Sequence, residues 1–199
     1  TLKGLKIVLD CAHGATYRTA PAVFSELGAD ITVINDNPDG LNINQDAGSI
    51  HPAFLQKAVL EKNADVGIAF DGDGDRLIMV DGDGHVVDGD QVLYLILKLY
   101  QQKKIMSGGV VGTLMTNLAF EEKCRELDIP FIRADVGDKY VAEALRKNKW
   151  MLGGENSGHI VLLDKHSTGD GIISALQLLA FLVSNEVSLN KALKEMPMY

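Results

Sequence analysis

The chain has 199 residues, of which 46% are hydrophobic and 23% are charged, a composition ordinary for one large or two small folded domains. Its formal net charge is −8 and it has no basic cluster, which argues against a nucleic-acid partner without excluding a phosphorylated small molecule. No apolar run approaches the ~20 residues that a membrane helix needs, so a membrane partner is not expected either.

The first half of the sequence alternates between the residue patterns of strands and helices. Short apolar runs bounded by Gly, Asn, Asp and Pro predict strands, and apolar residues three and four positions apart predict helices. The expected elements are a strand at 5–10, a helix at 20–27, a strand at 31–35, a helix from 52 to 59, and strands at 65–70, 77–80 and 85–87.

The second half repeats this plan with little residue identity. Its expected elements are a helix at 92–99, a strand at 109–113, a helix at 120–127, a strand at 131–134, a helix at 141–145 after the loop VGDKY, strands at 149–154 and 159–164, a helix at 170–183 and a short polar tail. Strands that alternate with helices pair in parallel in α/β units. The sequence therefore predicts two consecutive α/β domains of similar plan, residues 1–87 and 88–199, each a mostly parallel mixed sheet flanked by helices.

Two polar loops occupy the same place in the two halves. DGDGDR (71–76) and GENSGH (154–159) each follow the third strand of their half. Ligands of parallel sheets gather beyond the carboxyl ends of the strands, so two sheets that face each other would bring both loops to one cleft. This hypothesis fails if the loops lie on opposite sides of the molecule.

The acidic loop predicts a metal site. Asp71, Asp73 and Asp75 point the same way in an extended segment, and three converging carboxylates repel unless a cation sits among them. Oxygen ligands suit Mg²⁺ or Ca²⁺, but a calcium EF-hand counted from Asp71 fails because its sixth and twelfth residues are Arg and Gly rather than Gly and Glu. We therefore favour Mg²⁺ as the ion of this loop, with Arg76 binding a phosphate beside it. The alternative is that the loop is a solvated acidic turn without an ion. The similar DGDG at 81–84 is interpreted as a hairpin turn.

The first residues of the sequence and its two cysteines indicate whether the chain is a piece of a longer one and in which cellular compartment it resides. The first residues show no signal-peptide pattern, lack an initiator Met and lead almost directly into a strand. They suggest a piece of a longer chain, although removal of Met alone would also leave Thr1 first. Cys11 and Cys124 have neither metal-ligand spacing nor a disulfide framework, which favours a reducing compartment and a cytoplasmic location.

Several motifs resemble one enzyme family when they are taken together in this order. DGDGDR followed by LIMVD resembles the metal loop of the α-D-phosphohexomutases, and GENSGH resembles their sugar-binding loop. The segments DCAHGATY, PDGLNIN, VDGDQ, VGDKYV and GGENSGHIVLLDKHSTGDGI narrow the resemblance, which spans nearly the whole chain, to the phosphoglucosamine mutases of bacteria. That family has four domains, and this chain is similar to the second (1–87) and the third (88–199).

The resemblance implies an isomerase that interconverts glucosamine 6-phosphate and glucosamine 1-phosphate for the synthesis of UDP-N-acetylglucosamine and peptidoglycan precursors. In the family, a phosphoserine of the first domain donates to the sugar, and a hexosamine 1,6-bisphosphate serves as intermediate and activator. The fourth domain clamps a phosphate. Neither the phosphoserine motif nor the clamp motif stands in this sequence, so the resemblance implies a fragment that is inactive without those missing domains. A homodimer of the full-length enzyme is compatible with it.

The resemblance also assigns roles to residues. Mg²⁺ would be held by the three aspartates of the acidic loop, with a phosphoserine oxygen as the missing ligand, and Arg76 would steady the same phosphate. His159 would either assist a proton transfer or shape its loop. Lys139 stands where Arg is commoner in the family, and His13 stands where Asn is commoner. The sugar would contact Gly137, Asp138, Lys139, Glu155, Asn156 and Ser157, with Glu155 and Ser157 on its hydroxyls and Asp138 near its amino group.

Two other functions stay open at this point. A sister mutase for glucose or mannose phosphates would share these loops, and only VGDKYV favours glucosamine. A non-catalytic module that binds metal or sugar phosphate would be favoured if the gene encoded these 199 residues alone.

Overall fold

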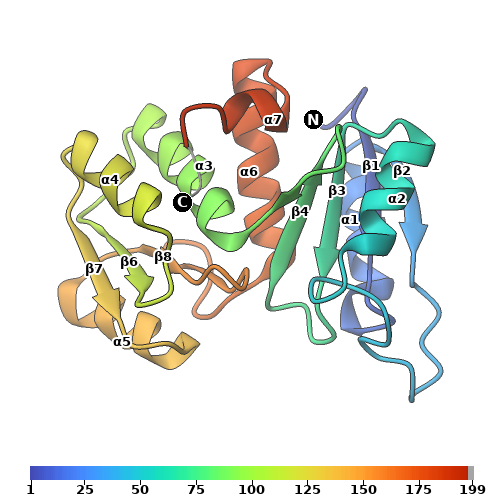
Figure 1. Cartoon of the computed structure of the whole chain (residues 1–199), viewed down its shortest axis with the longest axis horizontal. Helices are drawn as coiled ribbons and strands as arrows, with labels where there is room; N and C mark the ends of the chain where they lie inside the picture. The colour runs from blue at the N-terminus through green and yellow to red at the C-terminus, as the bar shows by residue number, and fades with distance from the viewer. Residues whose placement is uncertain (197–199) are drawn as a thin grey trace.

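Strands and helices alternate along both halves of the computed structural model, which describes residues 1–196 (Figure 1). The first half contains, in chain order, β1 (Lys6–Asp10), the 3-10 helix η1 (Ala15–Tyr17), α1 (Thr19–Glu26), β2 (Asp30–Ile34), α2 (Ala53–Lys62), β3 (Val66–Phe70), β4 (Leu77–Asp81) and β5 (Val86–Val87). The second half contains α3 (Gly89–Gln102), β6 (Val110–Thr113), α4 (Leu118–Glu126), β7 (Phe131–Ala134), α5 (Asp138–Asn148), β8 (Leu152–Gly154), β9 (Ile160–Leu162), α6 (Gly171–Asn185) and α7 (Leu189–Ala192).

The two sheets share one topology over four strands, and the first sheet has a fifth strand, β5. The first has the strand order β2-β1-β3-β4-β5, in which β2, β1 and β3 are parallel and β4 and β5 are antiparallel to their neighbours. The second has the order β7-β6-β8-β9, in which β9 alone runs antiparallel to its neighbour. The predicted fold class, two mostly parallel mixed sheets flanked by helices, is confirmed.

Each sheet is covered on both faces, which explains why its strands read as nearly continuous apolar runs. In β1, Val8 packs on the side of α2, whereas its neighbours Ile7 and Leu9 belong to the core on the opposite face, with α1 and α6. In the second sheet, Val111 packs toward α5, whereas Val110 packs toward α3 and α4. The alternation follows from the two-residue period of a strand.

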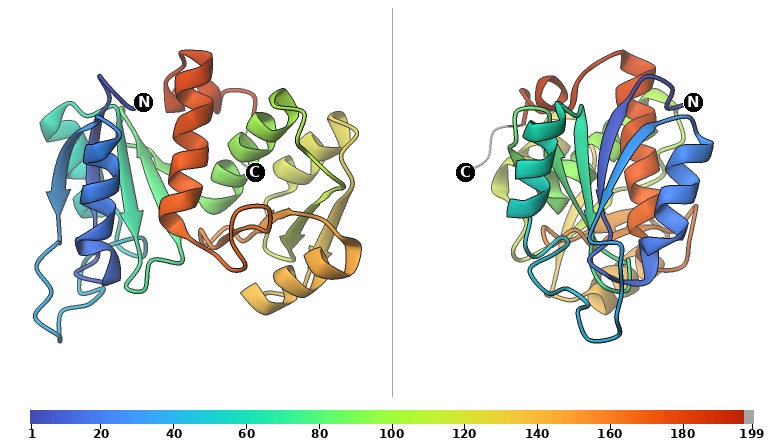
Figure 2. Two further views of the ribbon diagram at one scale, coloured as in Figure 1. Left: turned by 180° about the vertical axis from the view of Figure 1, so that it is seen from behind. Right: turned by 90° about the vertical axis from the view of Figure 1, so that its right-hand side faces the viewer.

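Helices α3 and α6 lie between the two sheets and join them (Figures 1 and 2). α3 begins with a capping box in which Asp88 and Gln91 exchange hydrogen bonds, and most of its residues are buried. α6 belongs to the second half by sequence, yet it contacts β4 of the first sheet as well as α3 and β9. One hydrophobic core therefore runs through both halves. The boundary proposed between residues 87 and 88 falls at the cap of α3 and stays a prediction.

The expectation of a polar tail after residue 183 is wrong. α6 continues to Asn185, and Leu189, Leu193 and Met196 then pack into the shared core. These apolar residues stand three and four positions apart on one face, so a short segment that looks polar in sequence still docks. Residues 197–199 of that expected tail lie outside the described residues. No helix in the described part of the chain has the length and apolar character needed to cross a membrane.

Asp90, in the first turn of α3, is a buried carboxylate that is 1% exposed. Its Oδ2 accepts a hydrogen bond from the amide of Asn117 at 2.7 Å, whereas Oδ1 has no hydrogen-bond partner among the described residues. Burial raises the pKa of Asp90 to about 6, against the opposing effects of the Asn117 amide and the Thr116 hydroxyl. The charge of nearby Asp88 raises it further.

We expect Asp90→Asn to gain stability relative to wild type as the pH rises. The folded protein holds the Asp90 proton more tightly than the unfolded chain, so wild-type stability falls between pH 3.8 and about 6 and stays lowered above that window. Asparagine has no charge and escapes this loss, so the difference in unfolding free energy should grow by up to about 3 kcal/mol across the window. Urea unfolding near pH 4 and near pH 7 measures it, with the exposed Asp83→Asn as control. A difference that does not change with pH would contradict the expectation.

Candidate active site

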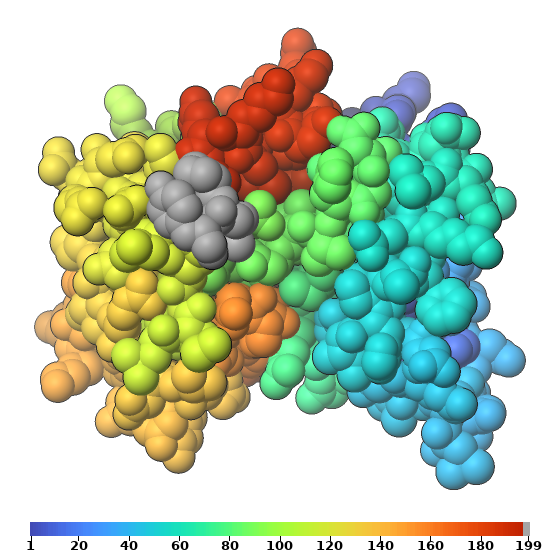
Figure 3. Space-filling model, viewed as in Figure 1, coloured from blue at the N-terminus to red at the C-terminus, as the bar shows by residue number. Residues whose placement is uncertain are grey.

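The two polar loops meet at the carboxyl ends of the parallel strands. Arg76 and His159 form an isolated antiparallel bridge between the loops. The amide of Leu77 donates to the carbonyl of Gly158 at 3.0 Å, so the backbones of the loops are hydrogen-bonded. The hypothesis that both loops lie at one place is therefore confirmed. In Figure 3 the lower outline of the molecule is indented between the blue first half and the yellow second half.

The acidic loop places its three carboxylates together. One oxygen each from Asp71, Asp73 and Asp75 can be chosen so that all lie within 4.8 Å of one another. Oδ1 of Asp71 accepts the amides of Gly74 and Arg76, both at 3.1 Å. Burial raises the pKa of Asp71 to about 6; the Arg76 amide opposes the rise, and the charges of Asp75 and Asp73 add to it. Three carboxylates this close disfavour their own ionisation, which a divalent cation would relieve.

Arg76 lies at the edge of this group and is half exposed. Its Nε is 3.8 Å from Oδ2 of Asp71 and 3.9 Å from Oδ1 of Asp75. These distances exceed those of hydrogen bonds, so the guanidinium balances the loop's charge without occupying the carboxylate oxygens. The position leaves its donors available to an anion.

The loop after β1 supports the acidic loop from behind. The amide of Ala15 donates to the carbonyl of Gly72 at 2.8 Å, and a Cβ on Gly14 would lie 2.2 Å from that same oxygen. Glycine at position 14 is therefore required for the close approach of the two loops. His13, at φ +48°, accepts the amide of Asn37 on Nδ1 at 3.3 Å and so shapes this loop rather than the metal group.

Asp10 organises the same edge of the sheet and was not among the residues predicted from the sequence. It is fully buried at the end of β1, where its carboxylate accepts the amides of Ala12 and Gly48, both at 3.0 Å. Burial raises its pKa, and these amides together with the Asn35 side chain lower it. An aspartate that ends an apolar strand and precedes a loop of small residues is the signal that could have predicted this role.

The residues that were predicted to contact a sugar lie close together only in part. Glu155 is 7% exposed, and its Oε1 accepts the amide of Gly137 at 3.0 Å, which ties the sugar loop to the turn before α5. Ser157 is exposed, and the carbonyl of Asn156 accepts the amide of Gly89 at 3.0 Å. The backbone of the sugar loop is therefore tied to the start of α3.

Asp138 and Lys139 belong to a helix rather than to the loop predicted from the sequence. α5 begins at Asp138 because Gly137, at φ +129°, turns the chain just before it. Both residues are exposed, and Nζ of Lys139 lies 4.6 Å from the centre of the Tyr140 ring. They line a pocket of about 230 Å³ together with His159, which is buried.

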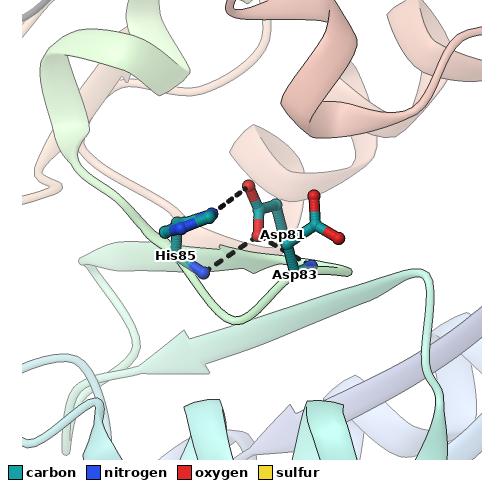
Figure 4. A group of neighbouring side chains, drawn as sticks. All are labelled: Asp81, Asp83 and His85. Carbon is teal, nitrogen blue, oxygen red and sulfur yellow. Dashed lines mark hydrogen bonds and ion pairs between the residues drawn. The ribbon is translucent and has the colours of Figure 1, made fainter.

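The second acidic group, Asp81, Asp83 and His85, differs from the first despite similar spacing (Figure 4). Oδ1 of Asp81 accepts the amides of Asp83 and His85 at 2.9 Å, and Oδ2 lies 3.3 Å from Nδ1 of His85. The Asp81 oxygens thus hold together the turn between β4 and β5, which pair antiparallel. The hairpin interpretation is confirmed. Because β4 runs antiparallel to β3, this turn lies at the sheet edge opposite the acidic loop.

Two protein-family models match the chain, one over each half of the fold. The family model of phosphoglucomutase/phosphomannomutase alpha/beta/alpha domain II matches residues 1–84, and that of domain III matches residues 88–199. The chain belongs to the phosphoglucomutase/phosphomannomutase family. The acidic loop lies in the part matched by domain II, and the GENSGH loop lies in the part matched by domain III.

Curated relatives in this family include two named phosphoglucosamine mutase. The protein of Methylobacillus flagellatus is 59% identical over 198 residues, which cover 100% of this chain and 44% of the relative. The protein of Nitrosospira multiformis is 54% identical over 198 residues, which cover 100% of this chain and 43% of the relative. The chain spans less than half the length of these relatives.

Solved structures of other proteins share the fold. A phosphoglucomutase/phosphomannomutase family protein from Burkholderia thailandensis superposes with a TM-score of 0.84 at 25% identity, over 97% of this chain and 43% of that one. The N-acetylphosphoglucosamine mutase of Aspergillus fumigatus, solved in complex with GlcNAc-6P and magnesium, gives a TM-score of 0.75 at 20% identity, over 99% of this chain and 51% of that one.

Proposed function

We propose that this chain is the metal-binding and sugar-binding middle part of a phosphoglucosamine mutase, a cytoplasmic isomerase that interconverts glucosamine 6-phosphate and glucosamine 1-phosphate. The observation that carries the proposal is the contact between the acidic loop and the GENSGH loop, through the Arg76–His159 bridge. It would set a phosphoryl group at the metal beside a sugar at the second loop. The identity of 59% to a protein named phosphoglucosamine mutase supports this choice within the family.

The residues of the acidic loop fit Mg²⁺. Asp71, Asp73 and Asp75 offer three carboxylate oxygens, the hard ligands that this ion prefers, and the cluster has an exposed side at Asp73. When bound, Mg²⁺ would supply charge neutralisation to a phosphoryl group. Arg76 would hold that phosphoryl group through its guanidinium, because its donors are not used by Asp71 or Asp75.

The second loop would bind and orient the sugar. Oε1 of Glu155 is engaged by the Gly137 amide, so we assign Oε2 to a sugar hydroxyl, next to the hydroxyl of Ser157. Asp138 would pair with the amino group, and Lys139 would face a phosphate at the far end of the sugar, with Asn156 and Gly137 shaping the loop. A phosphoserine and a phosphate clamp from the flanking domains would complete the site, with a hexosamine 1,6-bisphosphate as intermediate.

Turnover by the chain and by its longer form tests the proposal. We would measure conversion of glucosamine 6-phosphate to glucosamine 1-phosphate with Mg²⁺ and a trace of sugar bisphosphate. The 199-residue chain is expected to be silent, and the chain extended in both directions along its gene is expected to turn over.

The other outcomes separate the alternatives. Activity of the extended chain on glucose or mannose phosphates, without activity on glucosamine phosphate, would identify a sister mutase. It would overturn the assignment of glucosamine phosphate as the substrate. Silence on all three sugars by a chain that still binds metal would favour a binding module.

A further inference from the structure

We propose that His159 is a positioning residue for the metal site: its ring holds the carboxylate of Asp75 in place, so that the sugar loop sets the geometry of the acidic loop. The inference rests on the metal site proposed above. It assigns to His159 a role toward the metal ligand that is separate from proton transfer to the substrate.

The contact joins the two halves of the fold through side chains. Nδ1 of His159 lies 3.2 Å from Oδ2 of Asp75, and the histidine side chain is 4% exposed. Arg76, the other basic side chain near this carboxylate, keeps its Nε 3.9 Å from Oδ1. Nδ1 of His159 is therefore closer to the carboxylate of Asp75 than Nε of Arg76 is.

Asp75 needs an outside partner more than Asp71 does. Asp71 receives two backbone amides of its own loop, so its orientation is fixed locally. No backbone amide of the described chain donates to the carboxylate of Asp75, whose orientation must come from elsewhere. A metal site whose third carboxylate swings freely would lose affinity, because the ligand must be ordered when the ion binds.

The ring of His159 is itself fixed on its other side. A Cβ on Gly169 would lie 2.5 Å from Cε1 and 2.7 Å from Nε2, so glycine alone leaves room for the imidazole. The amide of Gly171, at the start of α6, donates to the carbonyl of Gly74 at 2.9 Å and holds the acidic loop against the same segment. The imidazole is therefore packed against the segment that leads into α6.

Three substitutions separate positioning from filling of space. His159→Asn places an amide nitrogen on Cγ, where Nδ1 stands in histidine. His159→Gln places it one bond further, toward the position of Nε2, and His159→Leu removes the polar atom. Each variant of the 199-residue chain would be titrated with Mg²⁺ alone by calorimetry, and with Mn²⁺ alone by electron paramagnetic resonance, with no sugar present.

We expect His159→Leu and His159→Gln to weaken metal affinity about 10-fold to 100-fold, the usual cost of losing a partner that orients a metal ligand. His159→Asn should retain most of the affinity. Wild-type affinity in the Leu and Gln variants, or equal losses in all three, would overturn the proposal. Should the Leu variant fail to unfold cooperatively in urea, the contrast between Asn and Gln decides.

The measurement is independent of the mutase assay. Failure of the extended chain to isomerise any sugar phosphate would leave the metal titrations and their interpretation unchanged. A wild-type chain that binds neither Mg²⁺ nor Mn²⁺ would overturn the positioning role together with the metal site, whatever the outcome with sugars.

Discussion

Asp73→Asn, made in the chain extended in both directions along its gene, is expected to lower the proposed conversion of glucosamine 6-phosphate about 10³-fold. A metal ion contributes several kcal/mol of charge stabilisation to a transferring phosphoryl group, and each 1.36 kcal/mol corresponds to a factor of ten. Asparagine keeps the shape of Asp73 but removes one of three charged oxygens that lie within 4.8 Å of one another. Initial rates over a range of Mg²⁺ concentrations measure the effect.

The fold should survive this change. Asp73 is exposed, so its replacement disturbs no core packing, and removing one carboxylate relieves repulsion within the loop. Urea unfolding of the variant without metal should therefore match or exceed that of wild type. A loss of activity that came with a loss of stability would point to a structural role instead.

Asp83→Asn is the matched control, since Asp83 stands in the same Asp-Gly-Asp-Gly context. Its carboxylate accepts the side-chain amide of Asn190, and it belongs to the hairpin turn at the other edge of the sheet. We expect its turnover to stay within a factor of two of wild type, roughly the scatter of neutral surface changes. Equal effects of Asp73→Asn and Asp83→Asn would contradict the assignment of the metal to the first loop.

Gly158→Ala is expected to be the most destabilising single change at the site, by about 4 kcal/mol. Gly158 has φ +97°, which alanine adopts only with strain, and its added Cβ would lie 2.2 Å from the carbonyl oxygen of Leu77. That contact is backbone against backbone at the place where the two loops join, so no side chain can move aside to relieve it. Urea unfolding of the 199-residue chain measures the loss.

Gly40→Ala separates the two causes. Gly40 has φ +88°, close to that of Gly158, but a Cβ there meets nothing within 4 Å. Backbone strain alone should cost roughly 1 kcal/mol at this position. If both variants lost the same stability, the junction between the acidic loop and the sugar loop would be looser in solution than the structure requires.

The candidate site was predictable where its chemistry is local. The alternation of aspartate and glycine in the acidic loop predicted converging carboxylates, and Asp71, Asp73 and Asp75 do converge. Their assignment to Mg²⁺ stays a prediction, as do the roles of Glu155 and Ser157 toward a sugar. The contacts of Glu155 with Gly137 and of His159 with Asp75 were not predictable, because residues 18 and 84 positions apart leave no mark in local spacing.

The two acidic groups have similar sequences but differ in which carboxylate oxygens are engaged, a difference that the sequence does not show. Both DGDGDR and DGDGH bring carboxylates together, and in each the first aspartate accepts two amides of its own loop on Oδ1. Oδ2 of Asp81 is also engaged within its turn, by the ring of His85, as the hairpin context indicated. Asp75 has no such amides and depends on the other half of the chain. Which oxygens are already engaged is a property of the folded backbone, and it distinguishes a turn from a candidate metal site.

The order of strands and helices, the parallel pairing and the position of both loops were predictable from local patterns, since apolar periodicity and Asp-Gly turns act over a few residues. Three features became visible only in the folded chain: α6 packs against the first sheet, α7 docks where a polar tail was expected, and the two loops are hydrogen-bonded to each other. These features depend on which buried surfaces fit together across the whole chain, and the packing of distant apolar faces leaves no local pattern to read.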